Sequence, residues 1–173
     1  MQWYSRIEQA GLSQHVLIVT GRGYSDFGTR RFLQLLTERD PNLSMFYIGD
    51  ADPFGAEIFF TYLFGSLTSC IIENKSHCST LFAMEWIGPF MQDYTNVIPR
   101  NNMLKLNSKD KLKIFSLLSK PYLADIYINQ VNNEGEEFLK FNLRRYKDHL
   151  KAMMNQDCKF EVEALLTSSD FLL

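Results

Sequence analysis

The fold is decided by residues 45–55, which read MFYIGDADPFG. The first four residues form a short apolar run, which suits a β-strand. A turn with two aspartates follows directly, and residues 54–64 then form a helix-length stretch that ends at Gly65. This order predicts a strand, a turn that carries Asp50 and Asp52, and a helix.

The preceding residues repeat this plan. Residues 16–19 read VLIV, which suits a strand buried on both faces of a parallel sheet, and they stop at the turn sequence TGRG of residues 20–23. Residues 29–39 then carry apolar side chains on one helical face, with Thr29 as the expected N-cap. Strand, helix, strand and helix in close succession predict a βαβ unit with parallel strands.

The rest of the chain is expected to be mainly helical. Residues 68–73 fit a further strand and residues 79–86 a short helix. Helices are then expected over residues 108–119 (capped by Ser108), 134–154 and 159–166. We therefore predict an α/β fold with a parallel sheet flanked by helices over residues 1–105. A C-terminal helical layer of the same domain spans residues 106–173.

Composition narrows the class of protein. A chain of 173 residues with 46% hydrophobic side chains can bury the core of one globular domain. The net charge of −2 argues mildly against DNA binding through overall positive charge, so phosphate contacts would need a local basic patch or a bridging metal. No apolar run is long enough to cross a membrane, and no secretory signal is evident, which predicts a soluble intracellular protein.

The cysteines give little functional signal. Three cysteines without a Cys-x-x-Cys pair predict free thiols in a reducing compartment. Cys70, His77 and Cys78 lie close together, but no fourth zinc ligand sits at a standard spacing, so free thiols are the better interpretation.

Two motifs fall where the predicted parallel strands end, which is where open α/β sheets bind ligands. Asp50 and Asp52 can project into one pocket, and paired carboxylates suit Mg²⁺ that also holds a phosphate. The glycines on either side of Arg22 would let the backbone approach a phosphate, and Arg22 adds a planar donor fork. Such aspartate pairs also cap helices and occur in phosphatases and sugar-nucleotide transferases, so the motif alone leaves these alternatives open.

The same residues carry a resemblance to a known family. Residues 19–30, VTGRGYSDFGTR, resemble the Gly-Lys-Gly-Tyr-Pro-Asp…Thr-Arg segment of the topoisomerase VI A/sporulation-eleven family, and residues 50–55 resemble its Asp-Ala-Asp-Pro-x-Gly segment. Further similar stretches follow in order at residues 57–66, 86–88, 106–110, 120–122, 159–165 and 168–172. The similarity runs from Tyr4 to Leu173 and is closest to the eukaryotic meiotic branch.

The resemblance implies a Toprim-like fold and a role in DNA double-strand breakage. In that family a tyrosine of each protomer attacks one strand and leaves a 5′-phosphotyrosyl bond, while the Toprim domain binds Mg²⁺. By position, Asp50 and Asp52 would be metal ligands. The residues that would face DNA are Arg22, Tyr24, Arg30 and Lys109. Simple packing is the alternative for Tyr24, and a solvated helix start is the alternative for Lys109.

Three departures from the family pattern matter. Arg22 stands in place of the usual lysine, and Ser25 in place of the usual proline. The third acidic ligand of the family aligns upstream of Met1, and Glu8 does not replace it. The winged-helix domain with the attacking tyrosine also precedes this region, so no catalytic residue is expected here and this chain alone should not cleave DNA. Because the chain stops before a segment usual in the family, we expect a shortened polypeptide or a clipped gene model.

The resemblance also implies partners. These are DNA, a second copy of the chain, meiotic accessory proteins and a topoisomerase VI B-like subunit, with chromosomes in the nucleus as the place of action. Two alternatives come from other classes: a non-catalytic DNA-binding or dimerisation module, and a Mg²⁺-dependent phosphotransferase or phosphatase with Asp50 as nucleophile.

Overall fold

The computed structural model describes residues 2–65, 84–125, 128 and 137–167. The elements, in chain order, are α1 (Gln2–Gln9), α2 (Phe27–Arg39), β1 (Met45–Ile48), α3 (Pro53–Phe64), β2 (Met84–Gly88), α5 (Met91–Tyr94), η1 (Arg100–Asn102), β3 (Leu104–Lys105), α6 (Ser108–Leu118), η2 (Pro121–Leu123), α8 (Glu137–Gln156), β4 (Cys158–Lys159) and η3 (Val162–Thr167). The expected strand at residues 68–73 and the cluster of Cys70, His77 and Cys78 lie outside the described residues.

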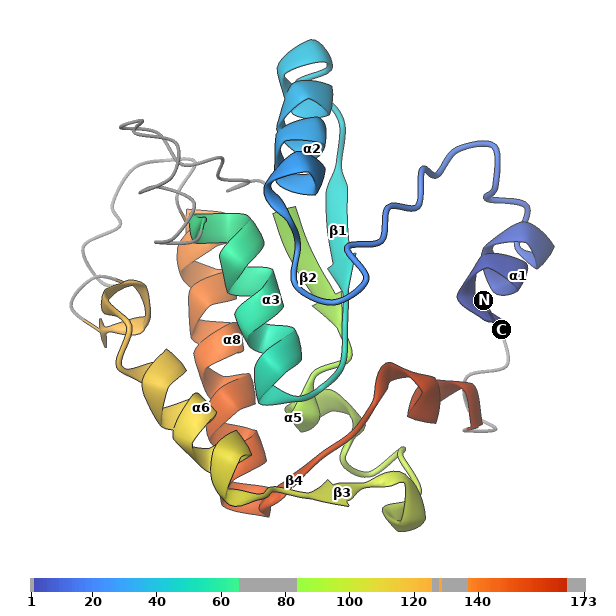
Figure 1. The fold of residues 1–173 in the computed structure, drawn as a ribbon. Helices are drawn as coiled ribbons and strands as arrows, with labels where there is room; N and C mark the ends of the chain where they lie inside the picture. The colour runs from blue at the N-terminus through green and yellow to red at the C-terminus, as the bar shows by residue number, and fades with distance from the viewer. Residues whose placement is uncertain (1, 66–83, 126–127, 129–136, 168–173) are drawn as a thin grey trace.

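The centre of the molecule is the pair β1 and β2, which run parallel with Tyr47 opposite Trp86. Helix α3 lies between them in the chain, and together with α8 and α6 it occupies one side of the sheet (Figure 1). A mixed α/β fold with a small parallel sheet is thus confirmed, as are the strand at residues 45–48 and the helix that follows it. Among the described residues, no helix is both long and apolar enough to traverse a lipid bilayer.

Local signals explain the bounds of α3. Asp52 is its N-cap and accepts a hydrogen bond from the Gly55 N–H, while Pro53 occupies the first turn, where its missing N–H costs nothing. At the other end Gly65 has φ 75°, a left-handed conformation that glycine adopts without a steric penalty.

The expected strand at residues 16–19 is not formed. These residues follow the free edge of β1 without ladder hydrogen bonds, and Leu17 is 67% exposed. An apolar run becomes a strand only when a partner strand lies within hydrogen-bonding reach, and here a cavity separates the two segments. The expectation that residues 16–19 are buried on both faces is wrong, because all four side chains are at least 37% exposed. β1 is buried on one face only, since Phe46 and Ile48 are about half exposed.

Four boundaries also differ from expectation. Helix α2 begins two residues earlier than predicted, with Asp26 as its N-cap, and α6 is capped by Asn107. Residues 84–86 belong to strand β2 and not to a helix, and the helix predicted over residues 159–166 is instead the end of β4 followed by the 3₁₀ helix η3. In each case a side-chain cap or a distant strand partner overrides the local pattern.

The core is an aromatic cluster between the sheet, α3 and α8. Phe59, Trp86 and Tyr146 are almost fully buried, with ring centroids 4.9–5.8 Å apart. Tyr146 also accepts the Trp86 N–H with its hydroxyl at 3.2 Å, so α8 is joined to β2 by packing and by a hydrogen bond. The helix predicted over residues 134–154 is confirmed from residue 137 on as α8, which supplies this side of the core.

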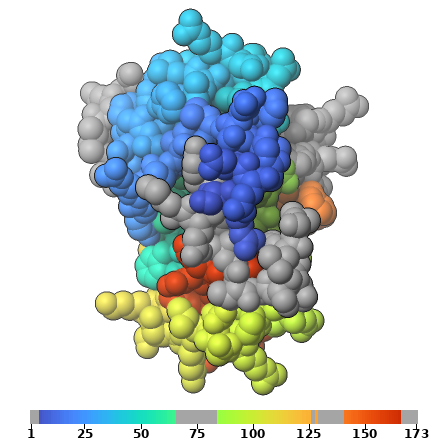
Figure 2. Space-filling view, turned by 90° about the vertical axis from the view of Figure 1, so that its right-hand side faces the viewer, coloured from blue at the N-terminus to red at the C-terminus, as the bar shows by residue number. Residues whose placement is uncertain are grey.

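A second link joins the C-terminal part to the end of β1. β4 pairs antiparallel with β3, and the Phe160 N–H then donates to the Ala51 carbonyl at 3.2 Å. We call residues 158–162 the crossing segment, because they run from β3 to the turn that follows β1. In Figure 2 the red η3 helix, which begins at the last residue of the crossing segment, lies between the blue N-terminal half and the yellow-green residues of the lower half.

Candidate metal and nucleic-acid site

Asp50 and Asp52 lie in the turn directly after β1, as the sequence predicts. Asp50 Oδ1 accepts the backbone N–H of Val162 at 2.8 Å, and Asp52 Oδ1 accepts that of Gly55 at 2.5 Å. Both carboxylates are therefore held in place by main-chain donors, one from the crossing segment and one from the first turn of α3.

Glycine at position 55 allows this geometry. A Cβ at Gly55 would fall well inside van der Waals distance of the Asp50 carbonyl oxygen, which is rigid backbone. The first turn of α3 can therefore lie against the end of β1 only with glycine at this position.

A lysine lies beside Asp52, the second aspartate of the acidic pair Asp50 and Asp52. Lys159 Nζ lies 3.8 Å from Asp52 Oδ2 and 2.9 Å from Asp110 Oδ1. Asp110 is fully buried, and its Oδ2 accepts the N–H of Asn107 in the capping box that starts α6. Asp52 and Asp110 thus share one ammonium where the start of α3, the start of α6 and the crossing segment converge.

Burial raises the pKa of the Asp52 carboxyl, opposed by the Gly55 hydrogen bond and the Lys159 charge. Burial disfavours the charged form of such a carboxylate, and a nearby cation stabilises that form. Hard oxygen ligands of this kind suit Mg²⁺, so the two aspartates fit the ion that the resemblance implies. Among the described residues, no group of three or more Asp, Glu, His or Cys side chains gathers around one point.

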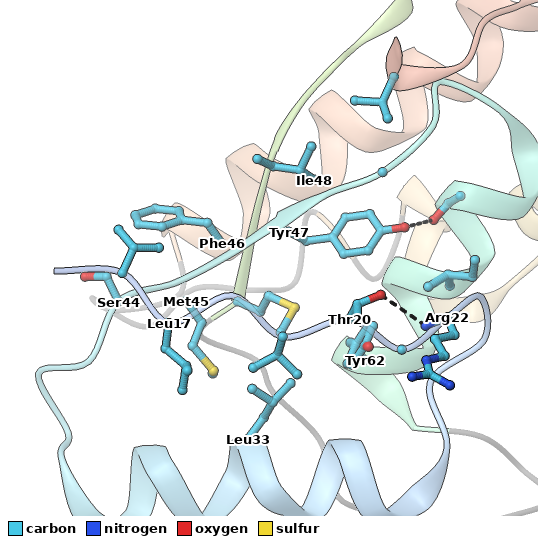
Figure 3. Close-up of a pocket in the computed structure, with 18 of the residues that line it drawn as sticks. Leu17, Thr20, Arg22, Leu33, Ser44, Met45, Phe46, Tyr47, Ile48 and Tyr62 are labelled. Carbon is cyan, nitrogen blue, oxygen red and sulfur yellow. Dashed lines mark hydrogen bonds between the residues drawn. The ribbon is translucent and has the colours of Figure 1, made fainter. Parts of the chain in front are cut away.

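A cavity of about 810 Å³ opens beside Asp50. Its walls come from residues 15–17 and 19–23, the free edge of β1, Met84 of β2, α2, α3 and the start of η3. Figure 3 shows the segment with Leu17, Thr20 and Arg22 running alongside β1, and Leu33 of α2 below them. Arg22 and Asp50 both line this cavity, so the structure brings together one residue from each predicted motif.

The turn around Arg22 has the backbone that its glycines suggest. Arg22 has φ 51° and Gly23 has φ 109°, and the Arg22 N–H donates to Thr20 Oγ1 at 3.3 Å. Gly21 lies close to Tyr62, because a Cβ at this glycine would come within 2.9 Å of the Tyr62 hydroxyl. A bulkier residue there would push the turn away from α3.

Tyr24 does not line the cavity but contacts α3. Its hydroxyl donates a short hydrogen bond to Glu57, whose two carboxylate oxygens also accept from Lys113 Nζ of α6 at 2.8 Å. Burial and the Glu57 hydrogen bond raise the pKa of the Tyr24 hydroxyl. The ring remains about half exposed, so packing and ligand contact are both compatible with its position.

The two other predicted DNA-facing residues are placed differently. Arg30 is 2% exposed and donates from Nη1 to the Ser25 carbonyl at 2.7 Å, so its guanidinium holds the turn before α2. Lys109 is exposed in the first turn of α6, away from the lining of the cavity.

Sequence reasoning missed Lys159, Asp110, Glu57 and Lys113. Lys159 and Asp110 lie 49 residues apart, and Glu57 and Lys113 lie 56 apart, so no local spacing connects them. Asp110 had one detectable signal, since an acidic residue three positions after Asn107 is typical of a capping box.

Comparison with known proteins gives one consistent set of relatives. Residues 4–173 match the family model described as topoisomerase 6 A-subunit/Spo11, Toprim domain. The chain is 34% identical over 154 residues to meiotic recombination protein SPO11-1 of Oryza sativa subsp. indica, covering 88% of this chain and 35% of that protein. It is 32% identical to SPO11-1 of Arabidopsis thaliana over 88% of this chain and 37% of the relative. It is 28% identical to SPO11 of Mus musculus over 90% and 35%. The chain therefore spans about a third of the length of these relatives.

Proposed function

Because the chain belongs to the topoisomerase VI A/Spo11 Toprim-domain family, we propose that it supplies the metal and DNA contacts of a protein that makes meiotic double-strand breaks. The observation that carries this proposal is the position of Asp50 and Asp52. They follow β1 directly, and Asp50 lines the same cavity as Arg22.

In this proposal Asp50 and Asp52 hold Mg²⁺. The ion supplies a positive charge that positions a DNA phosphate and offsets negative charge as the strand is attacked. The main-chain donors from Gly55 and Val162 orient the two carboxylates, so the ligands are fixed before any ion arrives.

Arg22, Tyr24 and Lys109 form the proposed DNA contacts. Arg22 presents a planar guanidinium from a turn with two positive-φ residues, which suits a phosphate. Lys109 is exposed at the start of α6, where the helix dipole also favours an anion. We leave Arg30 out of this surface because its side chain is buried.

The attacking tyrosine is not assigned to this chain. Burial raises the pKa of Tyr24, Tyr47, Tyr62, Tyr122 and Tyr146, so none of these five hydroxyls is activated toward phenolate. We propose that the nucleophile, a second copy of the chain, meiotic accessory proteins and a topoisomerase VI B-like subunit complete the enzyme in the nucleus. The printed names of the relatives, meiotic recombination proteins, support this context.

The test is binding of a short DNA duplex with and without Mg²⁺, by the wild type and by Asp50→Asn. We expect Mg²⁺ to tighten binding by the wild type and to have no such effect on the variant, because the amide removes a ligand charge. If the DNA affinity is high but changes neither with Mg²⁺ nor with the substitution, the metal site is rejected and a non-catalytic DNA-binding module is favoured.

The same mixtures distinguish the remaining alternative. On a denaturing gel the chain should carry no covalently attached DNA, because the attacking tyrosine is not assigned to this chain. Steady Mg²⁺-dependent hydrolysis of a simple phosphate ester, lost in Asp50→Asn, would replace the proposal with a phosphatase that uses Asp50 as nucleophile.

A further inference from the structure

We propose that Lys159 is the built-in counter-ion of the acidic pair, and that a divalent cation binds by displacing its ammonium from Asp52. This inference rests on the proposed function, since the cation concerned is the one that Asp50 and Asp52 would hold. It adds a residue to the site and a reason why the site is selective for a doubly charged ion.

The ammonium is placed by the fold. Lys159 is 17% exposed along its side chain, and its backbone belongs to β4, where it pairs with Leu104. The backbone N–H of the next residue, Phe160, donates a hydrogen bond to the carbonyl of Ala51, which lies between the two aspartates in the sequence. The backbone is thus fixed at Lys159 and at the residue after it. Nζ therefore stays beside Asp52 without the loss of side-chain freedom that weakens surface ion pairs.

Lys159 has a second and closer partner. Nζ lies 2.9 Å from Asp110 Oδ1 and 3.8 Å from Asp52 Oδ2. The Asp110 carboxylate is fully buried and also accepts the Asn107 N–H, so its pairing with Lys159 is complete without Asp52. The ammonium therefore keeps a stable partner when a cation replaces it beside Asp52, and the exchange leaves no buried charge without a partner.

The charge balance favours a divalent ion. Asp50, Asp52 and Asp110 contribute three negative charges and Lys159 one positive charge, which leaves a formal charge of −2 (−3 + 1). A divalent cation would neutralise this remainder, whereas a monovalent cation would meet the repulsion of the ammonium with half the attraction. Lys159 is thus expected to weaken binding of every cation and to exclude the singly charged ones.

The experiment is a binding titration with Mn²⁺ as the probe, followed by electron paramagnetic resonance, with Mg²⁺ as competitor. Lys159→Met keeps the length of the side chain and removes its charge. From Coulomb's law with near-water screening, we expect Mn²⁺ to bind the variant about ten-fold more tightly than the wild type. Lys159→Arg should bind within about two-fold of the wild type, because the positive charge remains.

A matched control is Lys147→Met. Lys147 is similarly buried, with 12% of its side chain exposed, and its ammonium pairs with Asp125 at 2.7 Å and with neither aspartate of the site. Its removal should leave Mn²⁺ affinity unchanged. Because Lys159→Met leaves Asp110 buried without a cation, the double variant Lys159→Met/Asp110→Asn is measured in parallel. It removes one positive and one negative charge, so the formal charge of the site stays at −2. A gain in Mn²⁺ affinity, expected to be smaller than that of Lys159→Met, then reports the loss of the ammonium beside Asp52.

The outcomes separate this inference from the proposed function. The counter-ion role is supported if Lys159→Met and Lys159→Met/Asp110→Asn both bind Mn²⁺ more tightly than the wild type, or if these two variants bind Mn²⁺ and the wild type does not. If the wild type binds Mn²⁺ through Asp50 and the Lys159→Met variants bind no more tightly, the counter-ion is overturned while the proposed metal site stands. If no folded variant binds Mn²⁺ at millimolar concentration, the metal site itself fails and the inference fails with it.

Discussion

At the scale of single residues, the molecule contains one buried histidine that the site does not use. His149 is fully buried on α8, and its Nδ1 accepts the Met91 N–H at 2.8 Å. Its ring meets those of Trp86 and Phe90 edge-on, at 5.0 and 5.4 Å between centroids. Nε2 finds no hydrogen-bond acceptor within the part of the chain that the structure describes. The ring therefore acts as a neutral core side chain that holds α5 on α8.

This environment predicts an acid-sensitive fold. Burial, with a smaller effect of the Arg145 charge, lowers the pKa of His149 from 6.5 to about 3. Below about pH 6.5 the unfolded chain therefore binds a proton that the folded chain does not bind. The free energy of unfolding should be level above that pH and fall by up to about 1.4 kcal/mol per pH unit below it.

Urea unfolding of the wild type and of His149→Asn between pH 7.5 and 4.5 measures this effect. The variant should be less stable throughout but lose stability less steeply as the pH falls, because asparagine does not titrate. His15→Asn is the control, since His15 is exposed, and it should keep the slope of the wild type. Equal slopes in wild type and His149→Asn would contradict the assignment.

At the scale of elements, the start of α3 decides the shape of the site. The Asp52 cap, Pro53 and the close approach at Gly55 are all local, and they fix the first turn of the helix against the end of β1. The glycine of α2 contrasts with this, because a Cβ at Gly28 would meet only Asp26 Oδ1, at an ordinary 3.4 Å.

The contrast gives a paired prediction. Gly55→Ala should lower the free energy of unfolding by about 1–3 kcal/mol, because the methyl group forces the helix away from rigid backbone. Gly28→Ala should be neutral or stabilising by up to about 1 kcal/mol, from helix propensity and a less flexible unfolded chain. Chemical denaturation of the two variants provides the measurement, and equal effects would mean that the approach at Gly55 is not tight.

Elements also show which parts of the fold sequence reasoning could reach. The strand at residues 45–48 and helix α3 were predicted well because cap, proline and C-terminal glycine are neighbours in the chain. The expected strand at residues 16–19 failed because it needed a partner strand, and the expected helix at residues 159–166 failed because β4 pairs with β3, more than fifty residues earlier. The aspartates of the site were found from one motif, whereas Lys159 reaches them only through that tertiary pairing.

At the scale of the whole molecule, the crossing segment joins the two parts of the chain. Phe160 is 1% exposed in the core, and its backbone N–H donates a hydrogen bond to Ala51, the residue between the two aspartates. Loss of this side chain should therefore affect the fold and the site together.

Phe160→Ala is expected to lower the free energy of unfolding by about 3–5 kcal/mol, through lost burial and the cavity left behind. Hydrogen exchange should also show faster exchange of the Val162 amide, which donates to Asp50. The milder Phe160→Leu serves if the alanine variant does not fold, with a cost of about 1 kcal/mol. Phe141→Ala, at a residue 65% exposed, is the control and should change neither quantity. Unchanged exchange of the Val162 amide in Phe160→Ala would show that the segment is held by other contacts.

The hydrogen bond from Val162 to Asp50 also bears on the order of folding. It joins residues 112 positions apart, so the chain must close a very long loop before this contact forms. Closing such a loop is slow compared with forming a helix or a hairpin. During synthesis on the ribosome, β1 and the start of α3 emerge long before the segment that orients Asp50. The acidic turn therefore spends that interval without its final geometry, and the site is among the last features of the domain to mature.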